Sequence, residues 1–122
     1  GSDGSTTRAE TYLGTISGNS ITWVQGTNMP VVRSHHTASI LSDGRILITG
    51  GHDGSTTRAE TYLGTISGNT ITWVQSTSLP AARYYHTASI LSDNRILITG
   101  GHDGSARAET YFGIVLIGGI KT

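Results

Sequence analysis

The feature that most constrains this chain is an internal repeat with a period of 50 residues. Residues 3–52 and residues 53–102 differ at nine positions and are identical at the other 41. A third copy begins at Asp103, lacks one threonine, and diverges after Tyr111. Repeats of about 50 residues built from short strands are typical of propeller blades. The period therefore favours a β-propeller over a helical solenoid.

Each period contains four segments with the composition and alternation of strands. In the first period these are residues 8–13, 21–25, 36–41 and 46–48, separated by turn signals at Ser17-Gly18-Asn19, Met29-Pro30 and Asp43-Gly44. Residues 46–48 are apolar at consecutive positions, which predicts a strand that is buried on both faces. No segment shows a helical pattern, so the predicted fold class is all-β.

The segments also share a set of motifs. In chain order these are Glu60-x-Tyr62, Trp73, Arg83-x-x-His86, the turn Asp93-Asn94-Arg95 and the run Ile96-Leu97-Ile98-Thr99-Gly100-Gly101. Together they closely resemble the kelch repeat, in the bacterial form related to the galactose oxidase propeller. The resemblance covers nearly the whole chain up to Tyr111 and implies blades whose strands, from innermost to outermost, are residues 86–91, 96–99, 58–63 and 71–75.

By this assignment the chain is divided within its blades. Residues 1–32 are a half blade with the third and fourth strands, and residues 33–82 are a complete blade. Residues 83–111 are a partial blade with the first strand, the second and a possible third, and residues 112–122 are a divergent tail. A closed propeller typically has four to eight blades, so about two blades per chain are too few.

Ring closure by copies of the chain follows from this count. A six-bladed homotrimer is expected first and an eight-bladed homotetramer second, with the half blade of one copy completing the partial blade of the next. A fragment of a longer propeller is the alternative. The tail leaves a second question open, because residues 107–112 resemble a third strand whereas residues 113–119 resemble a second strand.

The differences between the repeats indicate a candidate binding surface. Seven of the nine differences fall at positions 26 to 35, in the connection between two blades. Strand direction places this connection on the same face as the loop after the glycine pair. The predicted binding residues on that face are His35, His52, Tyr84, Tyr85 and His102. Drift in a loop that tolerates change is the competing interpretation.

Other repeated residues are predicted to support the blades. The arginines and histidines of Arg-x-x-His are expected to satisfy backbone groups near the inner strand, and the tryptophans are expected to pack between blades. The predicted structural residues are Trp23, Arg33, His36, Gly50, Gly51, Tyr62, Trp73, Arg83, His86, Gly100 and Gly101. His52-Asp53 and His102-Asp103 favour a turn over a metal site, so no metal or cofactor is predicted.

Composition excludes several partners. The formal net charge is zero and 13% of residues are charged, which gives no footprint for nucleic acid or an anionic membrane. The longest apolar run, residues 114–117, is far shorter than the roughly 20 residues of a membrane helix, so the chain is expected to be soluble. The compartment is not indicated, because the chain contains no cysteine.

The predicted function is a non-catalytic scaffold that binds a protein or a glycan. An extracellular enzyme related to the copper oxidases is an alternative class. It is disfavoured because the chain has no cysteine for the tyrosine–cysteine cofactor that the resemblance would imply. A repeat protein made to study blade assembly, with no natural ligand, is the third interpretation.

Overall fold

The computed structural model describes residues 1–91 and 95–114. Within these residues the fold is all-β, with nine strands in three antiparallel sheets and no helix, as the sequence predicted. Accordingly, this part of the chain contains no helix that could cross a membrane.

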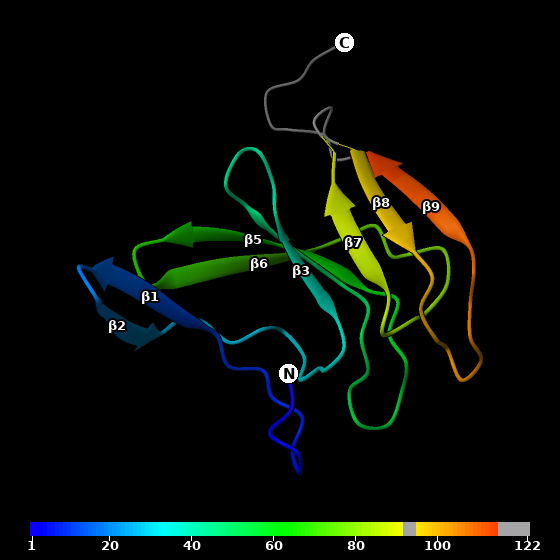
Figure 1. Ribbon diagram of the computed structural model, residues 1–122, viewed down its shortest axis with the longest axis horizontal. Coiled ribbons are helices and arrows are strands. Elements are labelled where there is room, and N and C mark those ends of the chain that lie inside the picture. The colour runs from blue at the N-terminus through cyan, green and yellow to red at the C-terminus, as the bar shows by residue number, and fades with distance from the viewer. Residues whose placement is uncertain (92–94, 115–122) are drawn as a thin grey trace.

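The three sheets follow one another along the chain (Figure 1). The first contains β1 (Tyr12–Ser17) and β2 (Ser20–Gln25). The second has the order β3 (Thr37–Ile40), β4 (Ile46–Thr49), β5 (Thr61–Ser67) and β6 (Thr70–Ser76). The third has the order β7 (Thr87–Ile90), β8 (Arg95–Thr99) and β9 (Thr110–Ile114). β3 and β7, the first strands of the second and third sheets, contact each other.

The third strand of the complete sheet lies later in the chain than predicted. The expectation was residues 58–63, whereas β5 runs from Thr61 to Ser67. The preceding backbone bonds to a loop, because the Arg58 N–H donates to the Gly51 carbonyl at 2.8 Å. The strand then continues to the two-residue turn Gly68-Asn69, where Gly68 takes a φ of +61°. β1 is shifted in the same way.

The central strand β4 is buried on both faces, as its apolar run predicted. Leu47 and Ile48 point to opposite faces and are each 4% exposed. On one face, Ile48 forms a core with Tyr62 of β5 and with Met29 from the connection after β2. Trp73 of β6 packs against this core. The first sheet is thereby attached to the second.

The last described strand answers part of the question about the tail. β9 pairs with β8 in the register Leu97↔Phe112 and Ile98↔Tyr111, so the chain supplies a third strand to its last sheet. Residues 115–122, which include most of the segment that resembles a second strand, lie outside the described residues. The described residues do not form a closed ring of sheets.

Candidate functional site

The five predicted binding residues lie together in one group of rings, called here the histidine–tyrosine cluster (His35, His52, Tyr84, Tyr85 and His102). The ring centroids of His35 and Tyr85 are 4.0 Å apart, and those of Tyr84 and Tyr85 are 5.1 Å apart. Tyr84 also contacts His52 and His102, with each centroid at 5.4 Å. Tyr84 is therefore the centre of the cluster.

Backbone bonds between loops position the cluster. The segments before β3 and β7 each pair with the loop after the following glycine pair, through the bridges Ser34↔His52 and Tyr84↔His102. The two repeats are joined because the Tyr85 N–H donates to the His35 carbonyl at 3.0 Å. Residues 50 positions apart in the chain thus form one surface.

Two members of the cluster have an unusual backbone. Among the described residues, His35 and Tyr85 are the non-glycine residues with positive φ, at 56° and 59°. This conformation costs about 1–3 kcal/mol and is often found at functional sites. It leaves Tyr85 62% exposed at the surface. Sequence analysis did not predict this strain.

Two hydrogen bonds join side chains within the cluster. The Tyr84 hydroxyl lies 3.1 Å from Nδ1 of His102, and the Tyr85 hydroxyl lies 3.2 Å from Nε2 of His35. Nδ1 of His52 accepts a hydrogen bond from the Gly54 N–H at 3.0 Å. The neutral His52 ring therefore carries its proton on Nε2. The cluster can offer aromatic faces and a few hydrogen-bonding groups to a ligand.

The aspartate beside His52 is bonded to its own loop. Oδ1 of Asp53 accepts from the N–H groups of Ser55 and Thr56 at 2.8 and 2.7 Å, and Oδ2 pairs with Arg58 at 2.5 Å. The backbone N–H groups, followed by Arg58, lower the pKa of Asp53 to about 2. Across residues 1–91 and 95–114 no group of three or more His, Cys, Asp or Glu side chains is arranged to hold a metal ion.

The two arginines of Arg-x-x-His are buried and bonded alike. Nη1 of Arg33 donates to the Gly50 carbonyl at 2.9 Å, and its guanidinium lies 5.1 Å from the centroid of the Tyr62 ring. One period later, Nη1 of Arg83 donates to the Gly100 carbonyl, and the Arg83 guanidinium lies 5.0 Å from the centroid of a tyrosine ring. That tyrosine is Tyr111, which the prediction of structural residues missed. The alignment of the third copy across its missing threonine could have identified it.

The first glycine pair lies at a contact between successive repeats. Gly50 and Gly51 have φ values of +61° and +103°, and the Gly51 N–H donates to the Arg83 carbonyl at 2.8 Å. A Cβ on Gly50 would lie 2.5 Å from the same carbonyl oxygen. Gly100 and Gly101 repeat these φ values at +64° and +105°.

The two tryptophans differ in their surroundings. Trp73 is half-buried against the core, and its Nε1 donates to the Thr27 carbonyl at 3.4 Å. Trp23 is 63% exposed, so within the described chain it does not pack between sheets as expected. The reason is that among the described residues β1 and β2 pair only with each other, whereas β6 packs against the core that includes Met29.

The two histidines just before β3 and β7, His36 and His86, predict an acid-labile fold. Nε2 of His86 bonds to the Thr49 hydroxyl at 2.8 Å, and burial lowers the pKa of both His86 and His36 from 6.5 to about 4. The unfolded chain then binds protons more readily than the folded one. The free energy of unfolding should therefore fall as the pH decreases from 6.5 to about 4, by up to about 1.4 kcal/mol per pH unit for each histidine.

Urea denaturation at several pH values measures this slope. His86→Gln is the matched variant, since its amide can still bond to the Thr49 hydroxyl but does not titrate. It should lose about half of the slope because His36 remains. An unchanged slope would show that His86 is not the titrating group.

Comparison with known proteins adds no relative to this description. The sequence matches no protein-family model and no curated protein.

Proposed function

We propose that the chain is a non-catalytic β-propeller scaffold of kelch-type blades that closes into a ring from several copies and binds a partner through the histidine–tyrosine cluster. The observation that carries the proposal is the convergence of five His and Tyr side chains from two repeats on one surface. Rigid scaffolds commonly carry their binding groups on such loops. Three copies in a six-bladed ring are the proposed assembly, and four copies in an eight-bladed ring are the second choice.

The arrangement of strands supports the blades. The second sheet is a four-stranded antiparallel meander, and its first strand contacts the first strand of the next sheet, as inner strands do around a propeller axis. The first sheet has two described strands and the third has three. Incomplete sheets at both ends favour closure by further copies, because open edges otherwise invite irregular association.

A protein is the proposed partner. Tyrosine supplies a large amphipathic contact area at low cost in conformational entropy, and Tyr84 and Tyr85 are adjacent. A glycan is the second candidate, because the exposed ring of Tyr85 could stack on a sugar face. The zero formal net charge favours neither a strongly acidic nor a strongly basic ligand.

The two repeats provide the test of this surface. Tyr84→Ser with Tyr85→His gives the second repeat the residues that the first repeat has at Ser34 and His35. Binders selected from a displayed peptide library and from a glycan array should lose at least about tenfold in affinity, as expected when aromatic anchor residues are removed.

The control is Asn28→Ser, which makes a similar exchange between repeats in the corresponding connection of the first repeat but outside the cluster. It should leave the affinity unchanged. Binders that retain full affinity for the double variant would contradict the cluster as the binding site.

A further inference from the structure

The chain contains one hairpin twice, in two different environments. The segments 11–19 and 21–25 are identical to 61–69 and 71–75. In the second copy, β5 and β6 are paired with β4 and packed on the core. In the first copy, β1 and β2 pair only with each other within the described chain.

The missing neighbours leave apolar side chains of the first hairpin uncovered. Tyr12 is 59% exposed whereas its equivalent Tyr62 is 9% exposed. Ile21 is 48% exposed whereas Ile71 is 3% exposed. Because the sequences are identical, the second hairpin shows which kind of surface the first would bury against: an edge like that of β4 and a face like the core around Trp73.

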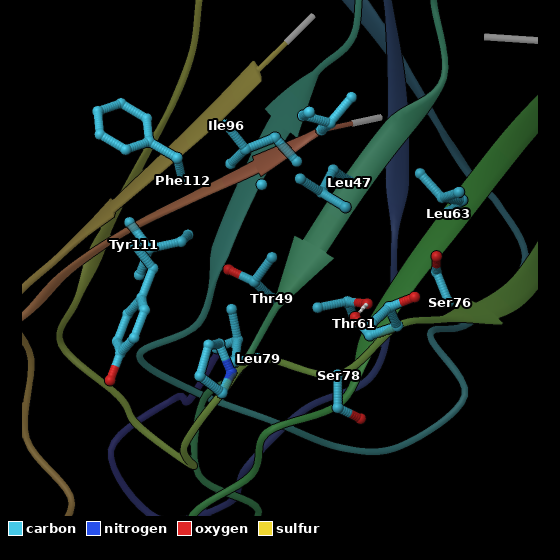
Figure 2. A pocket seen from close by; sticks show the side chains of 15 residues that line it. Leu47, Thr49, Thr61, Leu63, Ser76, Ser78, Leu79, Ile96, Tyr111 and Phe112 are labelled. Atoms are coloured by element: carbon cyan, nitrogen blue, oxygen red, sulfur yellow. Dashed lines mark hydrogen bonds between the residues drawn. The ribbon is translucent and has the colours of Figure 1, made fainter. Parts of the chain in front are cut away.

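The chain also carries a second copy of that surface. A groove of about 480 Å³ lies between the second and third sheets (Figure 2). Its lining includes the residues one repeat after Met29, Ile48 and Tyr62, which form the core on which Trp73 packs, and after Ile46, which packs against the same core. These lining residues are Leu79, Ile96, Ile98 and Tyr111. The counterpart of Trp73 is missing from the described part of this groove.

The polar partner of the tryptophan is also repeated. In the filled core, the Thr27 carbonyl accepts from Nε1 of Trp73, and the Thr27 hydroxyl accepts from the Ile71 N–H at 2.9 Å. Thr77 takes the corresponding position in the lining of the groove. An incoming strand that carries isoleucine and tryptophan at the spacing of Ile71 and Trp73 would meet the same two acceptors.

The free hairpin carries its tryptophan in the geometry needed for docking. Trp23 lies over Gly14, where an added Cβ would be 2.7 Å from the ring. Trp73 lies over Gly64 in the same way, with the corresponding distance at 2.6 Å. The ring position is thus set within the hairpin by the glycine opposite it, so docking requires little rearrangement.

We propose that the β1–β2 hairpin of a second copy of this chain docks beside β8 and inserts Trp23 into the groove between the second and third sheets. It takes the third and fourth strand positions of the last blade, in place of β9. The proposal rests on the ring closure put forward above and names the contact that would accomplish it.

The register of the contact follows from the repeat. Leu47 of β4 faces Leu63 of β5, so Leu97 of β8 would face Leu13 of the second copy. In the single chain Leu97 faces Phe112 of β9, which is largely exposed. β9 adds one strand, whereas the hairpin adds two and fills the groove. β9 is favoured at low concentration because it belongs to the same chain, so the exchange should depend on concentration.

Tryptophan fluorescence tests the insertion, because the chain has only two tryptophans. In Trp73→Phe the remaining Trp23 reports on the hairpin. With rising concentration its emission should shift to shorter wavelength, and its quenching by acrylamide should fall at least about twofold, in step with the oligomer fraction from light scattering. In the matched variant Trp23→Phe, the emission of Trp73 should not depend on concentration.

Disulfide trapping tests the register, because the chain has no native cysteine. Under mild oxidation, Leu13→Cys with Leu97→Cys should give covalent oligomers. The control pair Leu97→Cys with Phe112→Cys should give an internal disulfide at low concentration, and less of it as concentration rises.

The outcomes separate the two proposals. Oligomers in which Trp23 stays exposed and residues 13 and 97 do not crosslink would overturn the docking mode and leave ring closure standing. A monomer at every concentration would overturn both, and would indicate that the groove is filled by some other segment or partner.

Discussion

Gly51→Ala should lower the free energy of unfolding by about 3–5 kcal/mol, enough to unfold a marginally stable domain. Gly51 has a φ of +103°, a region that residues with a Cβ rarely enter. The new methyl group would also lie 2.9 Å from both Cβ of His36 and the Ser34 carbonyl oxygen. Strain and overpacking therefore act together. Urea denaturation followed by circular dichroism measures the loss.

Gly54→Ala is the matched control for this prediction. Gly54 has nearly the same φ, +99°, but a Cβ there would have only Thr7 Oγ1 as a neighbour, at 3.6 Å. It should show the backbone strain alone, about 1–3 kcal/mol. Equal losses in the two variants would mean that the close approach at Gly51 is not a constraint.

The glycine pair and Gly54 differ in what surrounds them. The Gly51 N–H donates to the Arg83 carbonyl, and the Cβ-free surface of Gly50 faces the same oxygen. Gly54 lies at an exposed loop tip. Gly50 is thus required by the contact with the next repeat and Gly51 by the close approach of Ser34 and His36 in its own repeat, whereas the later glycine is required only by its own turn.

Sequence periodicity predicted the hairpins well and the strand ends less well. Identical segments in two copies identified the strands, because alternation and turn residues are local signals. The start of β5 was missed since the backbone of Arg58 bonds to Gly51 in the preceding loop and to Arg83 in the connection after β6, and no alternation pattern encodes these contacts. The exposure of Trp23 was missed for a related reason. It depends on which sheet lies beside the hairpin, and the hairpin sequence is the same in both cases.

The histidine–tyrosine cluster shows the same division. Its members could be chosen from sequence because the variable connection and the loop after the glycine pair were expected on one face. The interactions between its members could not be predicted from sequence. The contact between Tyr85 and His35 depends on the left-handed backbone of both residues, a conformation that is uncommon for residues other than glycine and that the local sequence does not predict.

Arg33→Ala should lower the free energy of unfolding by about 3–4 kcal/mol. The Arg33 side chain is fully buried, donates to the Gly50 carbonyl and lies over the Tyr62 ring. A hydrogen bond from a charged donor contributes about 1.5–3 kcal/mol and a desolvated cation–π contact about 2 kcal/mol. Loss of the buried charge itself offsets part of this, since burial lowers the pKa of Arg33. Urea denaturation at pH 7 measures the change.

Arg8→Ala is the control, because Arg8 is exposed and pairs with Asp3 at the surface. It should leave the unfolding transition almost unchanged. A loss at Arg33 no larger than the loss at Arg8 would contradict the role of the buried guanidinium.

Arg83 extends the comparison to the last sheet, where the tyrosine under the guanidinium comes from β9. If the hairpin of a second copy replaces β9, Tyr12 of that copy takes the place of Tyr111 under Arg83. Arg83→Ala should then lower both the stability of the single chain and the fraction of oligomer, whereas Tyr111→Ala should lower the first and raise the second. Light scattering on both variants at equal concentration measures the difference, and oligomer fractions that fall together would show that β9 stays in its place.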